Sequence, residues 1–545
     1  MKFIYLISIS LILLIFGCYD DKGNYDYTPI NRIEIEGFTI GTQYLGDTIE
    51  IKPVLNFAID STENDLVFEW TVFDTKKFNM HDLFYITDTL GSGFIILRVK
   101  DTIKNIEYSQ FASITIKTEY EAEGYVILSK GNNNESHLSY IRLTTNANYT
   151  KEGEEHETNY YDCKDYYNVY EATNKESMGR GPLKLLQHFH SSNSENGSEV
   201  GAFWIFQEEP ECIDISGVSF QKDITLRSQF LDGMPADFHP YDMVDMRWSS
   251  FVIGKDGKMY SRKKATEFLF NSGHFLNNAV TFEEEGNIYE VSGAGVLHHR
   301  YSTGGYTLLY EKNLHRFLLM LDGNQQVGGG IAAPSVSGSS IYTPADAARI
   351  DDLGEMEMIY CGAYKSNYWA VSNYYYAILK DPKGIYYSYV FGINNTNYGE
   401  APTITGVTQK ALPDETQVLL NNILTGTNKN LFEIGAGDNA DGFQAANGKE
   451  RINYILITRD NELWLLDRST GLLELYDTFD ATITALDTEV YNSWVAGVGL
   501  ENGKFHMIEI TDAAYGGEHP KRMYSTESDF GEIVDIRYKS GSSWQ

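Results

Sequence analysis

Two pairs of polar residues in this sequence have a spacing that could bind a metal ion. His188 and His190 would lie on the same face of a strand, because side chains alternate between the two faces. Asp237 and His239 form a second pair with the same spacing. Neither pair has a third ligand at a fixed spacing, as a zinc site requires. The sequence therefore favours ordinary loop residues here and predicts no metal site and no cofactor.

The motifs that mark common enzyme classes are missing. The chain contains no HExxH, no GxSxG, no GxxxxGK[ST] and no GxGxxG that opens a helix. Residues 438–442, Asp-Asn-Ala-Asp-Gly, lack the acidic spacing and the final Glu of a calcium loop. With 76 acidic residues, some pair will have the separation that glycoside hydrolysis needs in any fold. We therefore expect no enzyme, and a surface hydrolase or lyase is the alternative.

A tyrosine-rich stretch from Tyr364 to Tyr389 is the most suggestive ligand-binding segment. A tyrosine ring has a flat apolar face and a polar tip, which suit stacking on a sugar or capture of a peptide backbone. We take Tyr368, Trp369 and Tyr375 as the candidate ligand-binding residues. In strands, half of these side chains would point into a core, so a structural role is the competing interpretation.

Composition limits the class of protein. The 545 residues exceed one ordinary domain, and 42% are hydrophobic and 14% aromatic, as in a globular protein with a large core. The 48 glycines and 39 tyrosines, with few long helix-forming runs, favour strands and tight turns, so we expect an all-β protein. The net charge of −33 would repel a phosphate backbone, which argues against nucleic-acid binding.

The N-terminus has the pattern of an export signal. Met1 and Lys2 precede an apolar run over residues 3–16, which is too short to span a bilayer comfortably. The run ends in Leu-Ile-Phe-Gly-Cys, which resembles a bacterial lipobox with Phe16 in place of the usual small residue. The resemblance implies a lipoprotein signal peptide over residues 1–17 and a lipid on Cys18.

The residues after Cys18 imply a destination. Asp20 and Asp21 resemble the signal that exports lipoproteins of Bacteroidetes-type bacteria to the cell surface. We expect the protein to be lipid-anchored in the outer membrane and to face the exterior. Residues 18–30 are polar, and we interpret them as a tether.

The other three cysteines, Cys163, Cys212 and Cys361, form no CxxC pair and allow at most one disulfide. Three free thiols are the simpler interpretation.

Residues 31–119 have the alternating pattern of a small β-sandwich. Trp70 lies in the middle of this segment and is the expected core anchor, since large aromatic side chains dominate such cores. The expected strands are residues 33–35, 48–51, 67–72, 93–99 and 111–116.

Several segments near the N-terminus resemble the PKD-like family of Bacteroidetes lipoproteins. They are residues 18–27, Glu69-Trp70-Thr71, Leu97 to Asp101, Thr118 to Tyr120 and Gly124 to Leu128. The resemblance implies an Ig-like (PKD-type) module on a surface lipoprotein, associated with SusC/SusD-type outer-membrane uptake systems. It assigns no catalytic residue.

The remaining chain, residues 120–545, contains a recurring hairpin of two strands around an Asp, Asn or Gly turn. The turns lie at residues 256–257, 285–286, 381–384, 460–461 and 501–503. Asp-Gly and Asn-Gly supply the positive φ angles that tight hairpins need. A unit length near 40 residues is typical of a β-propeller, here of about seven blades, and a set of non-repeating sandwiches is the alternative.

The C-terminus carries a further repeat signal. Residues 532–538, Glu-Ile-Val-Asp-Ile-Arg-Tyr, resemble residues 242–248, Asp-Met-Val-Asp-Met-Arg-Trp. Residues 242–248 precede a hairpin, whereas residues 532–538 at the C-terminus have no hairpin of their own. We therefore expect the C-terminal segment to pair with the strand that begins at Gly124, so that one blade shares strands from both ends of the propeller.

Together these features favour a non-catalytic surface lipoprotein that is an accessory to a SusCD-type TonB-dependent importer. The propeller would capture ligand or dock on the transporter. Peptide is preferred to glycan as the ligand only through the family resemblance. A purely structural partner of the transporter is a further alternative.

Overall fold

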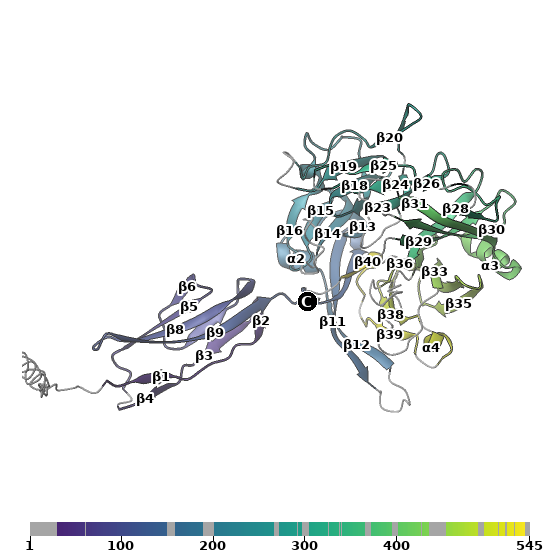
Figure 1. The fold of residues 1–545 in the computed structure, drawn as a ribbon. Coiled ribbons are helices and arrows are strands. Elements are labelled where there is room, and N and C mark those ends of the chain that lie inside the picture. The colour runs from purple at the N-terminus through teal and green to yellow at the C-terminus, as the bar shows by residue number, and fades with distance from the viewer. Residues whose placement is uncertain are drawn as a thin grey trace, which may run out of the picture. The chain divides into compact units, whose positions relative to one another are not determined.

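The computed structural model describes residues 30–539 except 60–61, 150–157, 189–200, 266–271, 292, 297–304, 325, 337, 339–340, 366–371, 395–401, 427, 435–453, 489–494, 511, 518–519 and 528. The chain divides into two units, unit 1 over residues 1–118 and unit 2 over residues 119–545. Both are built almost entirely of strands, as expected for an all-β protein (Figure 1). None of the described helices combines the length and apolar character needed to cross a bilayer.

Unit 1 is a small β-sandwich. Its larger sheet has the order β2-β9-β8-β5-β6, in which β2 is parallel to β9, and two-stranded sheets β1-β4 and β3-β7 pack opposite. The strands are β1 (Ile33–Ile35), β2 (Thr42–Tyr44), β3 (Thr48–Ile51), β4 (Leu55–Phe57), β5 (Leu66–Val72), β6 (Lys76–Phe78), β7 (Leu83–Ile86), β8 (Gly91–Asp101) and β9 (Ile106–Lys117). All five predicted strands are confirmed, and β2, β4, β6 and β7 are additional.

Trp70 anchors the core of unit 1, as predicted. Its ring is fully buried among apolar residues of both layers and packs against Phe38 at 5.7 Å. Its indole Nε1 donates to the backbone carbonyls of Met80 and His81, at 3.1 and 3.2 Å. The buried polar atom is therefore satisfied, as a stable core requires.

Unit 2 contains seven sheets of three or more strands in the described residues, which we number sheet 1 to sheet 7. Sheet 1 pairs strands from both ends of the unit. The strands of the first four sheets, in pairing order, are β12 (Thr158–Tyr166), β11 (Ser136–Tyr149), β10 (Gly124–Lys130) and β40 (Glu532–Lys539) in sheet 1; β13 (Arg180–His188), β14 (Ala202–Glu209), β15 (Ile213–Ser216) and β16 (Lys222–Thr225) in sheet 2; β17 (Pro240–Asp245), β18 (Ser249–Gly254) and β19 (Met259–Lys263) in sheet 3; and β22 (Gly293–Val296), β23 (Tyr306–Glu311), β24 (Arg316–Leu321) and β25 (Gly330–Ala332) in sheet 4.

The other three sheets follow in chain order. They are β26 (Ser335–Val336), β31 (Thr403–Ala411), β30 (Tyr386–Asn394), β29 (Ser372–Lys380) and β28 (Glu357–Lys365) in sheet 5, with β27 (Tyr342–Thr343) also on β31; β32 (Phe432–Ile434), β33 (Tyr454–Arg459), β34 (Glu462–Asp467) and β35 (Leu473–Thr478) in sheet 6; and β36 (Ile483–Thr488), β37 (Val495–Leu500), β38 (Phe505–Glu509) and β39 (Arg522–Ser525) in sheet 7. Outside them lie the hairpin β20 (Thr281–Glu284) and β21 (Asn287–Glu290), and the helical segments η1 (Asn132–Asn134), α2 (Val169–Asn174), η3 (Leu226–Gln229), α3 (Asp414–Leu424) and α4 (Asp512–Tyr515).

All five predicted hairpins are confirmed. They are β18-β19, β20-β21, β29-β30, β33-β34 and β37-β38. Gly257 and Gly503 occupy their turns at φ values of 87° and 84°, which side chains with a Cβ rarely adopt. The hairpin β20-β21 forms its own two-stranded sheet rather than the middle of a four-stranded one. This extra hairpin explains why the turns are irregularly spaced in the sequence.

Apolar cores lie between successive sheets of unit 2. Separate buried clusters join sheets 1 and 2, 2 and 3, 3 and 4, 4 and 5, 5 and 6, and 6 and 7. A seventh cluster joins sheet 7 to sheet 1 and contains Tyr125 and Ile127 of β10, Phe505 and Met507 of β38, and Ile536 of β40. Each sheet therefore packs against a sheet on both of its faces.

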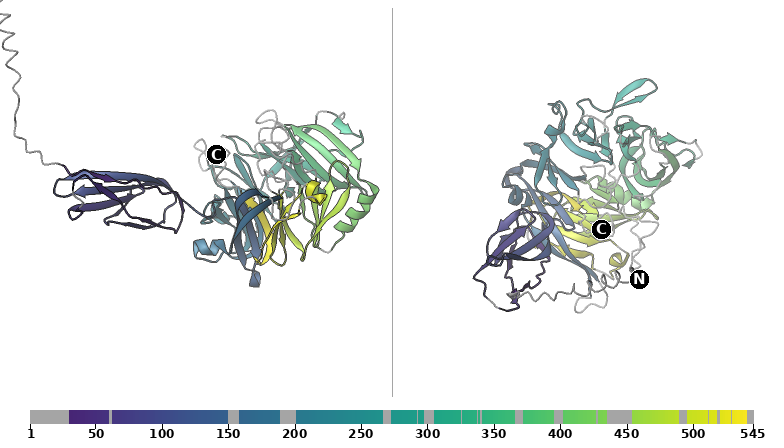
Figure 2. Two further views of the ribbon diagram at one scale, coloured as in Figure 1. Left: turned by 90° about the horizontal axis from the view of Figure 1, so that it is seen from below. Right: turned by 60° about the vertical axis from the view of Figure 1, so that its left-hand side comes forward.

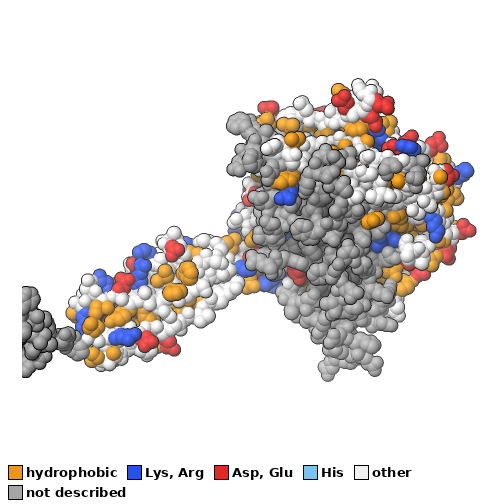
Figure 3. Space-filling view, viewed as in Figure 1, with side chains coloured by type: hydrophobic (Ala, Val, Ile, Leu, Met, Phe, Trp, Pro, Cys, Tyr) orange, Lys and Arg blue, Asp and Glu red, His pale blue; other side chains and the backbone are white. Residues whose placement is uncertain are grey.

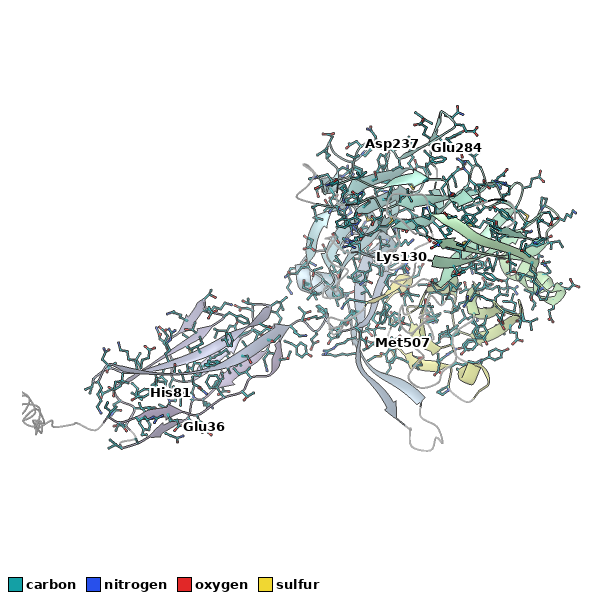
Figure 4. All side chains as sticks on the ribbon, viewed as in Figure 1. Glu36, His81, Lys130, Asp237, Glu284 and Met507 are labelled. Carbon is teal, nitrogen blue, oxygen red and sulfur yellow. The ribbon has the colours of Figure 1, made fainter. Side chains whose placement is uncertain are left out.

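The predicted pairing of the C-terminus with the strand that begins at Gly124 is confirmed. β40 is antiparallel to β10, with Tyr125 opposite Tyr538 and Ile127 opposite Ile536. In Figure 2 the yellow β40 accordingly lies beside the blue strands of sheet 1. Lys130, labelled in Figure 4, forms an ion pair with Glu532 at the far end of the same ladder.

Candidate functional site: a buried charged cluster in unit 2

A cluster of charged side chains lies where several strands of sheets 2, 3 and 4 end. Asp245 is the last residue of β17, His188 is the last of β13, and Arg262 and Lys263 end β19. Lys264 follows β19 directly, and Asp322 follows β24. Apart from Asp245, all of these residues are buried, and the Asp245 side chain is itself only 5% exposed. Burial of a charged group costs free energy unless the group is paired or hydrogen-bonded. The interaction partners of each charged side chain therefore determine whether it stabilises the fold.

The first close ion pair of the cluster joins Asp245 and Lys264. Lys264 Nζ donates to Asp245 Oδ2 at 2.8 Å, and Ser250 Oγ donates to Asp245 Oδ1 at 2.7 Å. Burial alone would disfavour the ionised carboxyl, but the charges of Lys264, His188 and Arg262 outweigh it and hold the pKa of Asp245 below its usual range. Asp245 is therefore a carboxylate.

The second pair consists of a histidine and an aspartate. His188 Nε2 lies 2.7 Å from Asp214 Oδ1, and neither side chain has exposed surface. The imidazole also stacks on Trp204 at 5.6 Å. The ring is thus held in one orientation by a carboxylate and an aromatic face.

Asp322 joins sheet 4 to sheet 3 through backbone groups. Its Oδ1 accepts hydrogen bonds from the backbone N–H groups of Trp248 and Ser249, both at 2.8 Å. Ser249 Oγ in turn donates to the Asp322 carbonyl at 2.6 Å. Burial nevertheless raises the pKa of Asp322 to about 7, because these hydrogen bonds only partly offset the loss of hydration.

The remaining two cations have no carboxylate within ion-pair distance among the described residues. Arg262 donates its Nε to Ser250 Oγ at 3.1 Å and its Nη1 to Gln229, and its guanidinium lies over the Phe275 ring. Lys263 Nζ donates to the Trp248 carbonyl at 3.2 Å. Burial lowers the pKa of both groups from their ordinary values, although nearby carboxylates oppose this shift.

Trp248 brings two cations together. The Arg247 guanidinium carbon lies 4.7 Å from the centre of the indole ring, and Lys263 Nζ lies 4.8 Å from it. Both distances are within the range of a cation–π interaction. The indole is itself largely buried, so its ring fixes the two positive groups rather than offering a free stacking face.

Aspartates also link the innermost strands of neighbouring sheets. Asp487 of β36 accepts a hydrogen bond from the Tyr538 backbone N–H of β40 at 2.6 Å. Asp535 of β40 accepts one from the Leu185 backbone N–H of β13 at 2.8 Å. Because each bond joins one sheet to the next, these carboxylates set the registration of sheets 7, 1 and 2.

The sequence signals for the cluster were partly visible. Asp245 belongs to the segment that resembles the C-terminal strand, and Asp245 and Asp535 occupy equivalent positions of two innermost strands. The basic run Arg262-Lys263-Lys264 at the end of β19 was a second signal, which the sequence prediction did not use. Asp322 had no local signal, because its partners are more than 70 positions away.

Tyr375 is not an exposed binding residue, and this part of the sequence prediction is wrong. It lies on β29, has no exposed surface and stacks on Phe391 with ring centres 5.0 Å apart. Its side chain belongs to the core between sheets 4 and 5. Alternation along the strand turns this face inward, which is the structural role that competed with ligand binding.

Most of the other predicted site residues lie outside the described part of the chain. Tyr368 and Trp369 lie outside the described residues, as do Cys18, Asp20, Asp21, His190 and residues 438–442. Asp237 and His239 are exposed, and Asp237 is labelled in Figure 4. In the described part of the chain, no group of three or more His, Cys, Asp or Glu side chains is arranged to hold a metal ion. Among the residues that the structure describes, no disulfide joins Cys163, Cys212 or Cys361.

Comparison with known proteins gives one family match. The PKD-like family matches residues 18–182, which extends beyond unit 1 to the first residues of β13. No curated protein sequence matches this chain.

Similar solved structures are distant. A quinonprotein alcohol dehydrogenase-like protein from Bacteroides thetaiotaomicron has 10% identity and a TM-score of 0.38, over 92% of this chain and 97% of that chain. AztD from Citrobacter koseri has 12% identity and a TM-score of 0.35, over 82% and 95%. The Cps50 (Swd1) β-propeller domain of Myceliophteria thermophila has 9% identity and a TM-score of 0.31, over 65% and 92%. The all-β fold is given by the strands of the chain itself, and the match to the PKD-like family covers residues 18–182.

Proposed function

We propose that unit 2 is a closed β-propeller of seven blades and that it serves as a non-catalytic binding module. The observation that carries the proposal is the cyclic order of the apolar cores, in which sheet 7 packs against sheet 1 as each other sheet packs against the next. A ring of this kind leaves no unprotected end sheet. Its two faces are made of the turns between strands, where binding residues are most often found.

The ring would be carried on the cell surface by a lipid anchor. The signal-like N-terminus with Cys18, and the PKD-like match that begins at residue 18, support this part of the proposal. We further propose that the protein is an accessory to a SusCD-type TonB-dependent importer of peptide, or alternatively glycan. Unit 1 would act as the spacer between the lipid and the propeller.

Unit 1 has a surface that favours docking on a transporter. Phe94 and Phe111 on the outer face of β8 and β9 are 46% and 64% exposed, and their rings meet edge to face at 5.9 Å. Phe84 and Ile86 on β7 are also exposed, on the opposite layer of the sandwich. Figure 3 shows apolar side chains on the surface of this unit. Exposed aromatic side chains in a small domain are typical of partner contact, which supports the second candidate function, a structural transporter partner.

The proposal can be tested by capture from solubilised outer membranes. We expect the tagged protein to retain a SusC/SusD-type transporter, and the double variant Phe94→Ser/Phe111→Ser to lose it. The matched control Ser92→Ala/Thr115→Ala changes exposed polar residues on the same two strands. Equal capture by the double variant would place docking elsewhere. No transporter in any sample, or turnover of peptides or glycans by the purified protein, would overturn the proposed function.

A further inference from the structure

One edge of the larger sheet of unit 1 is only partly paired. The strand β9 pairs with β8 over residues 106–116. On its other side β9 pairs with β2 only at residues 115–117. Among the described residues, no strand pairs with residues 106–114 on that side. A free edge of this length presents a row of unpaired N–H and C=O groups, to which another extended chain can bond.

The direction of these backbone groups follows from a bond at the end of β9. The Lys117 carbonyl accepts a hydrogen bond from the Leu45 N–H at 2.9 Å, so it points to the β2 side. Successive residues of a strand direct their N–H and C=O groups to opposite sides, so the odd-numbered residues of β9 share this direction. Those with no backbone partner on that side, among the described residues, are Glu107, Ser109, Phe111 and Ser113.

A hollow of about 580 Å³ lies beside this edge. Its walls include residues 32–37, which contain β1, and residues 108–110 of β9. Tyr108 and Gln110 belong to the face of β9 that turns into the sandwich, yet both are partly exposed, whereas Ile114 on the same face is buried. The second layer therefore leaves this end of β9 incompletely covered.

The strand β1, in the other wall of the hollow, has a free edge as well. It pairs with β4 only. Glu36 donates its backbone N–H to the Val54 carbonyl, so the even-numbered residues here point to the β4 side. By the same alternation, Ile33 and Ile35 direct their N–H and C=O groups away from β4. Residues with unpaired backbone groups thus line the hollow from both sides.

The border of the hollow is acidic. Glu34 and Glu36 are exposed in its wall, and Glu36 is labelled in Figure 4. Glu107, which Arg98 approaches to 3.6 Å, is exposed at the start of β9. Arg32 is the only basic residue in the walls. A second copy of this chain would bring the same acidic border and a net charge of −33, so charge disfavours self-pairing and favours a basic partner.

We propose that the free edge of β9 takes up an extended, basic segment of a partner protein as an additional strand. The segment continues the row that β2 begins, and its backbone bonds to the odd-numbered residues of β9 supply affinity. Side chains on one of its faces cover the hollow, and lysine or arginine side chains meet Glu34 and Glu36. This contact uses neither the propeller nor the rings of Phe94 and Phe111, so it goes beyond the proposed function.

The first experiment is isothermal titration calorimetry on the purified protein. The probe is the peptide acetyl-Lys-Val-Lys-Thr-Lys-Val-Lys-amide, whose blocked ends imitate a segment inside a longer chain. One matched peptide has Glu in place of every Lys, and another, acetyl-Lys-Lys-Lys-Lys-Val-Thr-Val-amide, has the same composition without alternation. We expect the alternating basic peptide to bind at least tenfold more tightly than either, which corresponds to about 1.4 kcal/mol. Equal binding of the two basic peptides, or no binding of the alternating one, would overturn the inference.

A proline variant tests the backbone edge directly. Ser109→Pro removes an N–H that points away from β8, so it blocks the edge without breaking the ladder inside the sheet. We expect it to weaken binding of the alternating peptide at least tenfold. Ser109→Ala keeps the N–H and is the matched control, which should bind like the parent. Equal binding by the two variants would refute strand addition at β9.

A second pair of variants leaves the backbone unchanged. Glu34→Gln/Glu36→Gln should weaken the alternating peptide about threefold or more, because two exposed charges beside the hollow are lost. The matched control Glu50→Gln/Glu63→Gln removes two exposed glutamates elsewhere in unit 1. An equal loss in both double variants would reduce the effect to overall charge and would contradict the site.

Hydrogen exchange read by mass spectrometry locates the bound strand. We expect the alternating peptide to slow exchange in the fragment that contains residues 106–114, since new hydrogen bonds protect amides that were free. Slowed exchange only in fragments of unit 2, or none in residues 106–114, would place the peptide elsewhere and refute the inference. The transporter takes no part in these measurements, so the proposed function can fail while this inference succeeds, and the reverse.

Discussion

Ser129 of β10 donates its hydroxyl hydrogen bond to the backbone carbonyl of Phe530 at 2.6 Å, although the two residues are 401 positions apart in the chain. The bond lies next to the ladder in which β40 completes sheet 1. Lys539, at the end of that ladder, is fully buried and donates to the carbonyl of Ala122 at 2.7 Å. The first and last strands of unit 2 are therefore fastened to each other at both ends of one sheet.

Removal of β40 should destabilise unit 2 as a whole. Deleting residues 532–545 would expose the edge of β10 and remove the buried side chains of Ile533, Ile536 and Tyr538. Each contributes about 1.5–3 kcal/mol, so the sum approaches the total stability of a typical domain. We expect aggregation or a large drop in melting temperature. Deleting only residues 541–545 is the control, and two deletions that melt alike would contradict the closure.

Replacement of Cys18 tests the lipid anchor. We expect Cys18→Ala to release the protein from the membrane fraction, because the residue that would carry the lipid is lost. Fractionation and surface protease accessibility are the measurements. The variant Asp20→Ala/Asp21→Ala should remain in the membrane but lose surface exposure. Membrane retention of Cys18→Ala would refute the lipoprotein proposal, whereas unchanged exposure of the double variant would refute only the export signal.

Asp322 should make the stability of unit 2 depend on pH. The folded protein holds its proton up to a pKa of about 7, whereas the unfolded chain releases it near the usual value of 3.8. Its contribution to stability is therefore fully present below about pH 4 and is lost as the pH rises through 7. The loss is at most on the order of 4 kcal/mol.

The variant Asp322→Asn isolates this effect, because an amide does not titrate and its oxygen can still accept the two backbone hydrogen bonds. Urea unfolding of parent and variant at pH 5 and pH 8 is the measurement. We expect the parent to lose stability relative to Asp322→Asn between these values. A constant difference across this range would show that the carboxyl group does not titrate there.

Tyr375 should behave as a core residue. Tyr375→Ala removes a fully buried ring that stacks on Phe391, and we expect a loss of about 3–5 kcal/mol in the free energy of unfolding. Tyr375→Phe keeps the ring and is the matched control, with a much smaller loss. Denaturant unfolding measures both. A stable Tyr375→Ala protein would contradict the position of this side chain in the core.

Tyr368 and Trp369 remain predicted ligand-binding residues. If they are exposed, Tyr368→Ala/Trp369→Ala should keep the melting temperature of the parent and weaken ligand or transporter binding by more than about 1 kcal/mol, or fivefold. The same capture and calorimetry assays apply. A variant with unchanged binding would move the recognition surface away from this segment.

Local patterns in the sequence determined the secondary structure well. The Asp-Gly and Asn-Gly turns of Gly257 and Gly503 marked their hairpins because positive φ angles are required there whatever the tertiary fold. Alternation around Trp70 likewise identified β5 and the sandwich core, since a half-buried strand needs an apolar residue at every second position. These are short-range requirements, so the sequence alone states them.

Only the tertiary structure decided which faces and which distant residues meet. Tyr375 reads as a binding residue in a tyrosine-rich strand, but packing between sheets 4 and 5 makes it part of the core. Asp322 acquires its shifted pKa from burial and from backbone N–H groups at Trp248 and Ser249, more than 70 positions away. Electrostatic and packing energies depend on separation in space, and a sequence fixes that separation only along a single strand or turn.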